Sequence, residues 1–591
     1  MKIIPTVLVI SLMLFMEHSA GATPAAGAPE AKLAAFFQSY LDQYFQEHPT
    51  DATGLGDHRF DGQLDDISAA ARAGWVELAE QTLADLPKQV EYQALSRDGQ
   101  IDYEIFQHQL QTQLWLEKNT HPFAEDPRTY GGYLNDSVYV LLTQSTLPAE
   151  TNIANCLLRM AQFPRIIATA EATLTHPPLP VLETAIRQNQ GAIAFYQGDL
   201  FQLTGNTVQL AALKAAAATV VMQLQGYQAF MEGSLRARAD GDWRLGPEKF
   251  KAKLDLVLEA GESADQVLAD ARAEFDRVQR DLYVISRQLW STHYPTANLP
   301  ADDADGRRET ITRVINEVDQ EHGKPEDLIN EARATVTEIK QFIRDHHYLQ
   351  LPEPDHCQVI EMPEFRRGNS LAYLENAPPL DPAAVSFYAV SPPPADWTPA
   401  QKTSFLEEYN QHMLKILTIH EAYPGHYVQL SRANQNPSLI RRVYQSGPFV
   451  EGWAVYGEIT MLNEGFGGGD LKLRLMQLKF YLRAVANAIL DNQMHCTQMT
   501  DAEALQFLTR DAYQSEGEAK LKLIRAKQSS TQLSTYFVGR MAHYRLHQEI
   551  EHELGDKFNL EQYHEAVLSH GSVPVKYLPE LVRSGLGLPG K

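Results

Sequence analysis

Cysteine, positive charge and long apolar runs are all scarce in this chain of 591 residues. Its three cysteines, Cys156, Cys357 and Cys496, are too few and too scattered for a disulfide framework or a thiolate zinc site. Lysine and arginine number 51 against 75 aspartates and glutamates, so the formal net charge is -24. Because proteins that bind nucleic acids need a basic face, this balance argues against a nucleic-acid partner.

The most continuous apolar run lies at the N-terminus. Lys2 is followed by apolar residues 3–16, and residues 20–22 read Ala-Gly-Ala, a triplet of the type that signal peptidases cut. Residues 1–22 are therefore predicted to be a cleaved signal peptide, and the protein is expected to be exported, periplasmic or secreted. The alternative is an N-terminal membrane anchor, but the run is shorter than the ~20 residues of a spanning helix. No cysteine lies near the cut site, so we expect no lipid anchor and no stable membrane anchor after cleavage.

The mature chain is rich in helical periodicity. Hydrophobic residues make up 44% and charged residues 21%, which is typical of a folded globular protein. An apolar stripe at helical spacing begins at Leu33, and similar patterns cover residues 208–231, 248–290 and 325–345. Residues 23–350 are accordingly predicted to form a helical N-terminal scaffold region.

The pattern changes near residue 351. Prolines cluster up to residue 400, and three short runs look like strands bounded by turns: His356–Met362, Ser370–Glu375 and Ser386–Val390. Helical patterning returns at Gln401. The sequence thus predicts a mainly α fold, in which residues 351–591 form a catalytic region of short strands followed by helices. The last strand is a candidate for pairing its edge with an extended peptide.

One motif carries most of the chemical information. Residues 420–426 read His-Glu-Ala-Tyr-Pro-Gly-His, at the end of a segment with helical apolar spacing. A zinc hydrolase needs two imidazoles on the metal and a carboxylate beside the first to take a proton from zinc-bound water. On a regular helix, histidines six residues apart point about 120° away from each other. A break at Pro424 and Gly425 is therefore expected to bring His420 and His426 together.

A third ligand is expected from a following helix. Residues 451–458 read Glu-Gly-Trp-Ala-Val-Tyr-Gly-Glu, with small residues suited to close packing. Glu451 is the predicted ligand, while Glu458 is expected to support the site or face solvent. The alternative is that these histidines and glutamates are ordinary core or surface groups. The chain shows no phosphate loop, dinucleotide fingerprint or serine nucleophile elbow that would favour another chemistry.

The two motifs together resemble the bacterial domain-of-unknown-function family 885, grouped with the gluzincin-like zinc metallopeptidases. The resemblance extends to residues 386–388, 483–484 and 534–539, and to the pair Asp491 and His495. It implies zinc held by His420, His426 and Glu451, with Glu421 as general base, on a mainly helical scaffold with a small sheet beside the site. The chain departs from the family by having Gln493 where a glycine usually stands two residues before the histidine.

Three further residues are candidates for supporting roles. His495, with Asp491 four residues before it, could hydrogen-bond the substrate; the alternative is a surface pair. Tyr536 is the candidate donor to the charge that develops on the reacting carbonyl, and its alternative is a core tyrosine. Arg540 is expected to be a salt-bridged scaffold residue or to bind a substrate carboxylate.

The sequence as a whole predicts an exported zinc metallopeptidase that hydrolyses amide bonds of small peptides. Glu421 would activate zinc-bound water and pass its proton to the leaving amine. Two alternatives remain: a zinc amidase on a non-peptide amide, and a non-catalytic helical periplasmic binding protein. The expected partner is a peptide or small amide substrate, and the sequence makes no prediction of oligomeric state.

Overall fold

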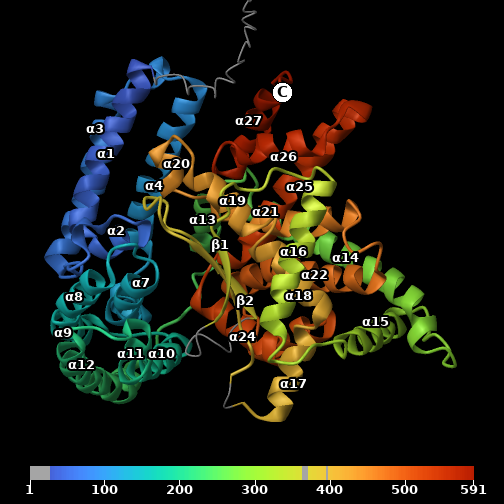
Figure 1. Ribbon diagram of the computed structural model, residues 1–591, viewed down its shortest axis with the longest axis horizontal. Coiled ribbons are helices and arrows are strands. Elements are labelled where there is room, and N and C mark those ends of the chain that lie inside the picture. The colour runs from blue at the N-terminus through green and yellow to red at the C-terminus, as the bar shows by residue number, and fades with distance from the viewer. Residues whose placement is uncertain (1–26, 363–370, 395–396, 591) are drawn as a thin grey trace, which may run out of the picture.

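The computed structural model describes residues 27–362, 371–394 and 397–590. The predicted signal peptide, residues 1–22, lies outside the described residues. Before the sheet the chain is helical, and Figure 1 shows these helices from blue to yellow-green. Their bounds are α1 Ala28–Glu47, α2 Pro49–Leu55, α3 Ala69–Gln89, α4 Arg97–Asn119, α5 Pro122–Glu125, α6 Arg128–Gly131, α7 Ser137–Thr143, α8 Ala149–Met160, α9 Phe163–Thr173, α10 Leu179–Gln197, α11 Asp199–Thr204, α12 Leu210–Phe230, α13 Pro247–Leu258, α14 Ala264–His293, α15 Ala304–Asp319 and α16 Leu328–Asp345.

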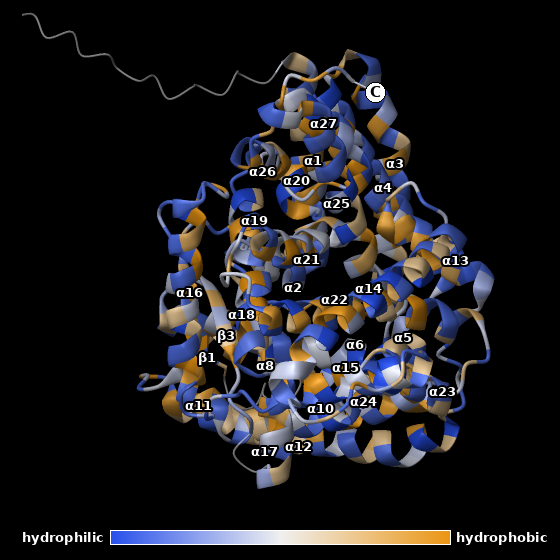
Figure 2. Cartoon of the chain, turned by 90° about the vertical axis from the view of Figure 1, so that its right-hand side faces the viewer, coloured by the Kyte–Doolittle hydropathy of each residue, from blue (hydrophilic) through white to orange (hydrophobic). Residues whose placement is uncertain are grey.

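These bounds confirm the helices predicted from apolar spacing. The stripe that begins at Leu33 lies on α1, and the pattern at 325–345 is α16. Gly261 separates α13 from α14 and has a positive φ of 76°, a conformation that glycine adopts without strain. Figure 2 shows the resulting mixture of hydrophobic and hydrophilic residues on α16, a helix that buries one face.

A small sheet follows, and it confirms the three predicted strands. The strands are β1 Cys357–Glu361, β2 Ala372–Glu375 and β3 Ser386–Val390, in the order β1-β3-β2. β1 pairs parallel to β3 and β2 pairs antiparallel to it. The predicted pairing of the Ser386–Val390 edge with a peptide is wrong, because β3 is the central strand and both of its edges are occupied. β2 is the edge strand on the side away from β1.

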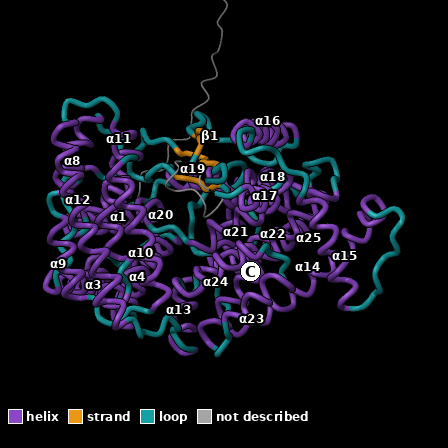
Figure 3. Tube along the Cα trace, turned by 90° about the horizontal axis from the view of Figure 1, so that it is seen from below, coloured by secondary structure: helices purple, strands orange, loops and turns teal. Residues whose placement is uncertain are grey.

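The rest of the chain is again helical. In Figure 3 the strands form a small patch among these helices, close to α19. The bounds are α17 Pro399–Glu408, α18 Gln411–Glu421, α19 His426–Asn434, α20 Leu439–Val443, α21 Gly447–Asn463, α22 Leu471–Cys496, α23 Asp501–Gln506, α24 Glu516–Gln528, α25 Thr535–Leu554, α26 Leu560–Leu568 and α27 Leu578–Gly585.

The hydrophobic core does not divide at residue 350. The larger buried cluster extends from Leu33 to Val582 and includes residues from α1, α14 and α22. A second cluster, from Leu64 to Leu235, lies within the N-terminal helices, which Figure 1 shows as a separate group around α7–α12. The predicted N-terminal and C-terminal regions therefore share one core, with a satellite core in the N-terminal one.

None of the helices in the described part of the chain combines the length and the apolar character needed to span a bilayer.

Candidate metal centre

The predicted helix break brings the two motif histidines together. α18 ends at Glu421 and α19 begins at His426, so the histidines lie on two separate helices. Between them the backbone N–H of Gly425 donates to the carbonyl oxygen of Ile419 at 3.0 Å. A Cβ at Gly425 would lie 1.9 Å from the carbonyl oxygen of His420, so only glycine fits this turn.

α21 packs against this turn. The indole Nε1 of Trp453 donates to the carbonyl oxygen of Pro424 at 2.9 Å, in a fully buried contact. α21 also crosses α25 with the two backbones in close contact: a Cβ on Gly452 would lie 2.3 Å from the carbonyl carbon of Gly539. These two contacts fix the position of Glu451, which precedes Gly452 on α21.

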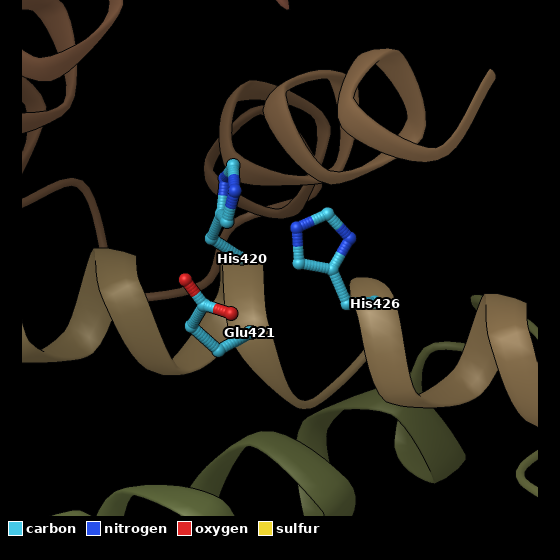
Figure 4. A group of neighbouring side chains, drawn as sticks. All are labelled: His420, Glu421 and His426. Atoms are coloured by element: carbon cyan, nitrogen blue, oxygen red, sulfur yellow. The ribbon is translucent and has the colours of Figure 1, made fainter. Parts of the chain in front are cut away.

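Three side chains converge at this point. The Oε2 atom of Glu451 lies 3.6 Å from Nε2 of His420 and 3.5 Å from Nε2 of His426. The two imidazole rings are nearly perpendicular, at 85°, with their centroids 4.7 Å apart. Figure 4 shows the two rings next to one another, with the carboxylate of Glu421 beside them. Candidate ligand atoms of His420, Glu421 and His426 all lie within 4.8 Å of one another.

The site is strongly negative and largely buried. His420 is 5% exposed, and its Nδ1 lies 2.7 Å from Oε1 of Glu458, which is completely buried. Burial alone would lower the pKa of His420, but the carboxylates of Glu451 and Glu458 outweigh it and raise that pKa well above its usual value. Burial likewise would raise the pKa of Glu451, but the two histidines hold it well below the usual range. The cluster therefore favours a bound cation, whether a proton or a metal ion.

The donor set fits a zinc ion. Two imidazole nitrogens and one carboxylate oxygen are the ligands of many catalytic zinc sites. Oε2 of Glu451 is buried and, apart from its contacts with the two histidines, has no hydrogen-bond partner among the described residues, so it is available to a bound ion. The contact from Glu458 to His420 is the carboxylate–histidine arrangement that orients a metal-binding imidazole.

Two carboxylates, Glu421 and Glu451, compete for the role of third ligand. Oε2 of Glu421 accepts a hydrogen bond from the backbone N–H of Leu374 on β2 at 3.0 Å. That bond turns one of its oxygens toward the sheet, whereas Oε2 of Glu451 approaches both imidazoles and has no hydrogen-bond partner among the described residues. The geometry therefore favours Glu451 over Glu421 as the third candidate ligand and leaves the Glu421 carboxylate beside the site.

A pocket opens beside His420 and Glu421. Tyr536 lines it, as does Arg525, whose Nη2 donates to the Tyr536 hydroxyl at 3.1 Å. Burial is the main cause that raises the pKa of Tyr536, with the charge of Glu451 adding to it, so its hydroxyl stays protonated and able to donate. The structure thus places the predicted donor in the same pocket as the predicted base.

The predicted catalytic role of His495 needs correction. Nε2 of His495 lies 3.0 Å from the carbonyl oxygen of Ala526 and 2.9 Å from that of Ser529, and the backbone N–H of Leu245 approaches Nδ1 at 3.4 Å. Both ring nitrogens are therefore engaged by backbone groups in a side chain that is 2% exposed. The residue does not line the pocket described above. His495 holds the end of α24 in place.

The expected partner of His495 makes other contacts. Asp491 accepts hydrogen bonds from the backbone N–H of Thr531 at 3.0 Å and from the Ser534 hydroxyl at 2.8 Å. It therefore fixes the turn that leads into α25 and Tyr536. Arg540 is 2% exposed, and its Nη1 lies 3.2 Å from Oε1 of Glu274, so it has the scaffold role.

Sequence reasoning assigned no role to five pocket residues. They are polar or charged side chains that line the pocket: Tyr409, Arg483, Asn487, Lys522 and Arg525. They lie on or next to three different helices, and no spacing within the chain predicts that these helices meet. The single available signal was the resemblance at Arg483, which indicated no role.

Comparisons with known proteins give a family but no activity. No curated protein matches the chain. A solved structure of a candidate lipoprotein of unknown function from Shewanella oneidensis is similar over 92% of this chain and 98% of its own, with 30% identity and a TM-score of 0.78. A candidate lipoprotein from Colwellia psychrerythraea shares the fold, with a TM-score of 0.77 over 95% of this chain and 99% of its own at 17% identity.

The family model described as "Bacterial protein of unknown function (DUF885)" matches residues 49–582, which include the motifs at 420–426 and 451–458 and the pocket. The chain belongs to this family of bacterial proteins, DUF885.

Proposed function

We propose that this protein is an exported zinc-dependent hydrolase that cleaves amide bonds of small peptides. The observation that carries the proposal is the position of the Glu451 Oε2 atom, which lies 3.6 Å from Nε2 of His420 and 3.5 Å from Nε2 of His426. The carboxylate of Glu421 lies close to the same two histidines. The grouping of family 885 with gluzincin-like zinc metallopeptidases, which the resemblance of the two motifs implies, agrees with this proposal. Export is supported by the candidate signal peptide and by the description of both structural relatives as candidate lipoproteins.

Each residue of the candidate site has a defined role in this proposal. His420, His426 and Glu451 would hold a zinc ion, which supplies a Lewis acid that polarises the scissile carbonyl. Glu421 takes a proton from the attacking water and delivers it to the leaving amine, as a general base and then a general acid. The Leu374 N–H fixes the orientation of the Glu421 carboxylate through its Oε2 atom. Tyr536 donates a hydrogen bond to the oxygen of the reacting carbonyl as negative charge develops there.

The test compares the mature wild-type chain with Glu421→Gln, which keeps the shape of the side chain but removes the base. Metal content is measured by elemental analysis, and hydrolysis of a mixed short-peptide library is followed by mass spectrometry with and without a chelator. We expect about one zinc in both proteins, with cleavage reduced on the order of 10²–10⁴-fold in Glu421→Gln. Glu326→Gln, in an exposed loop between α15 and α16, is the matched control and should retain full activity.

Other outcomes assign the site differently. Wild-type protein without stoichiometric metal would overturn the ligand assignment and favour a binding protein. Zinc with no peptide cleavage would overturn the peptidase proposal and direct the search to non-peptide amides.

A further inference from the structure

The pocket beside the metal centre has a cationic wall. Arg483, Lys522 and Arg525 line it together with His420 and Glu421. Arg483 comes from α22, and the other two come from α24. Positive side chains thus lie on the same cavity as the proposed base.

The carboxylate of Glu518 is the acidic partner of two of these cations, Arg483 and Lys522. Oε1 of Glu518 forms an ion pair with Nη2 of Arg483, and the same oxygen is the nearest acidic atom to Nζ of Lys522, at 3.9 Å. Its other oxygen, Oε2, accepts a hydrogen bond from the Tyr409 hydroxyl at 3.3 Å. Because Glu518 carries one negative charge and is already shared with Arg483 and Tyr409, the charge of Lys522 is only weakly compensated.

Lys522 is also buried. The residue is 4% exposed, yet its side chain reaches the pocket, where an ammonium group whose carboxylate partner lies 3.9 Å away is costly. Burial and the neighbouring Arg483 lower the pKa of Lys522 well below its usual value. An anion bound in the pocket would reverse this effect, because it would restore a partner to the ammonium group.

We propose that the pocket binds a carboxylate of the substrate at Lys522, with Arg483 and Arg525 beside it, while the scissile amide lies next to Glu421. This inference rests on the proposed hydrolase function and names its substrate class: short peptides that carry a negative charge near the bond that is cut. The carboxylate belongs either to the C-terminus of the peptide or to an acidic side chain. A guanidinium and an ammonium group are the usual protein partners of either one.

The test measures binding rather than turnover, so it does not depend on catalysis. Zinc-loaded Glu421→Gln protein is titrated by calorimetry with Ala-Ala-Ala as free acid and as C-terminal amide, and with amidated Ala-Glu and Ala-Gln. We expect the carboxylate form of at least one pair to bind at least ten times more tightly than its neutral form. The first pair detects a terminal carboxylate and the second an acidic side chain.

Variants then identify which cationic side chains of the pocket bind the carboxylate. Lys522→Met, made in the Glu421→Gln background, should remove most of this preference, whereas Lys522→Arg should restore it. Arg525→Gln changes an exposed residue, so it tests the cationic wall without disturbing a buried residue. It should reduce the preference for the charged peptide about threefold. Lys520→Met, on the exposed face of the same helix, is the matched control and should have no effect.

Equal binding of charged and neutral peptides in both pairs would overturn the proposal, as would an unchanged preference in both Lys522→Met and Arg525→Gln. Failure of the hydrolase proposal looks different: wild-type protein would cleave nothing, while the preference for a carboxylate and its loss in Lys522→Met would persist.

Discussion

Gly452 on α21 and Gly539 on α25 pack with their backbones in contact, at the point where the two helices cross. A Cβ on Gly452 would lie 2.3 Å from the carbonyl carbon of Gly539, and a Cβ on Gly539 would lie 1.8 Å from the carbonyl oxygen of Pro448. Glu451 adjoins the first glycine, and Tyr536 lies one turn before the second. The crossing therefore sets the distance between the proposed metal ligand and the proposed donor.

Alanine at this crossing should damage both stability and the site. For Gly539→Ala we expect a loss of about 1–3 kcal/mol in the free energy of unfolding, because the methyl group overlaps a backbone carbonyl and the helices must separate. Urea denaturation and zinc titration measure the two effects. Gly517→Ala is the control, since Gly517 is exposed and, apart from its own helix backbone and its chain neighbours, no described atom lies within 4 Å of the place that its methyl group would take. It should be neutral or slightly stabilising.

Removal of the carboxylate behind His420 should weaken metal binding without removing a ligand. In Glu458→Gln the 2.7 Å contact to Nδ1 of His420 loses its charge, so the imidazole becomes a poorer ligand. We expect zinc affinity to fall about 10–100-fold, as measured by competition with a chelating dye. Unchanged affinity would show that Glu458 does not act on the metal centre.

His495 should matter for stability and not for chemistry. In His495→Phe the carbonyl oxygens of Ala526 and Ser529 lose their donor inside the protein, which should cost about 1–3 kcal/mol. Zinc content and the pH profile of any peptide hydrolysis should stay the same in protein that remains folded. A loss of turnover larger than the loss of folded protein would restore the catalytic interpretation that the structure does not favour.

Two buried histidines should make the fold sensitive to acid. Burial lowers the pKa of His543 to about 4 and that of His564 to about 3. Since both values lie below the usual pKa, the unfolded chain binds more protons than the folded one between about pH 3 and pH 6.5. Stability should therefore fall as the pH decreases through this range, by roughly 3 kcal/mol for His543 and roughly 5 kcal/mol for His564.

Urea midpoints measured from pH 7 to pH 4 check this slope. His543→Gln and His564→Gln should each be less stable than wild type at pH 7, where a packed hydrogen-bonded group is lost, and each should show a shallower decline toward acid. A decline as steep as that of the wild type in both variants would assign the acid sensitivity to other groups.

The sequence predicted those features that depend on local patterns. Apolar periodicity located α1 and α16, turn residues bounded β1, β2 and β3, and the proline-glycine pair in the motif indicated where the helix breaks. Glu451 followed from chemistry and spacing, and the structure brings it to the histidines.

Features that depend on contacts between distant segments were not predictable. His495 has a helical neighbour of the right chemistry in Asp491, but the carbonyl groups that it binds belong to the end of α24, about thirty residues further along the chain. Lys522 and Arg483 meet only because α22 and α24 pack together. The order of the strands also comes from tertiary packing, which places β3 in the centre.

The interruption between α18 and α19 has a wider consequence for how this centre can evolve. In a regular His-Glu-x-x-His helix, one rigid turn fixes the separation of the two imidazoles, so sequence change elsewhere leaves it alone. Here each imidazole belongs to its own helix, and the hydrogen bond from Trp453 to Pro424 joins them to a third. If this centre holds the proposed metal, substitutions remote from any ligand would therefore change the coordination geometry, and with it the preference among zinc, cobalt and manganese, within one unchanged set of donor atoms.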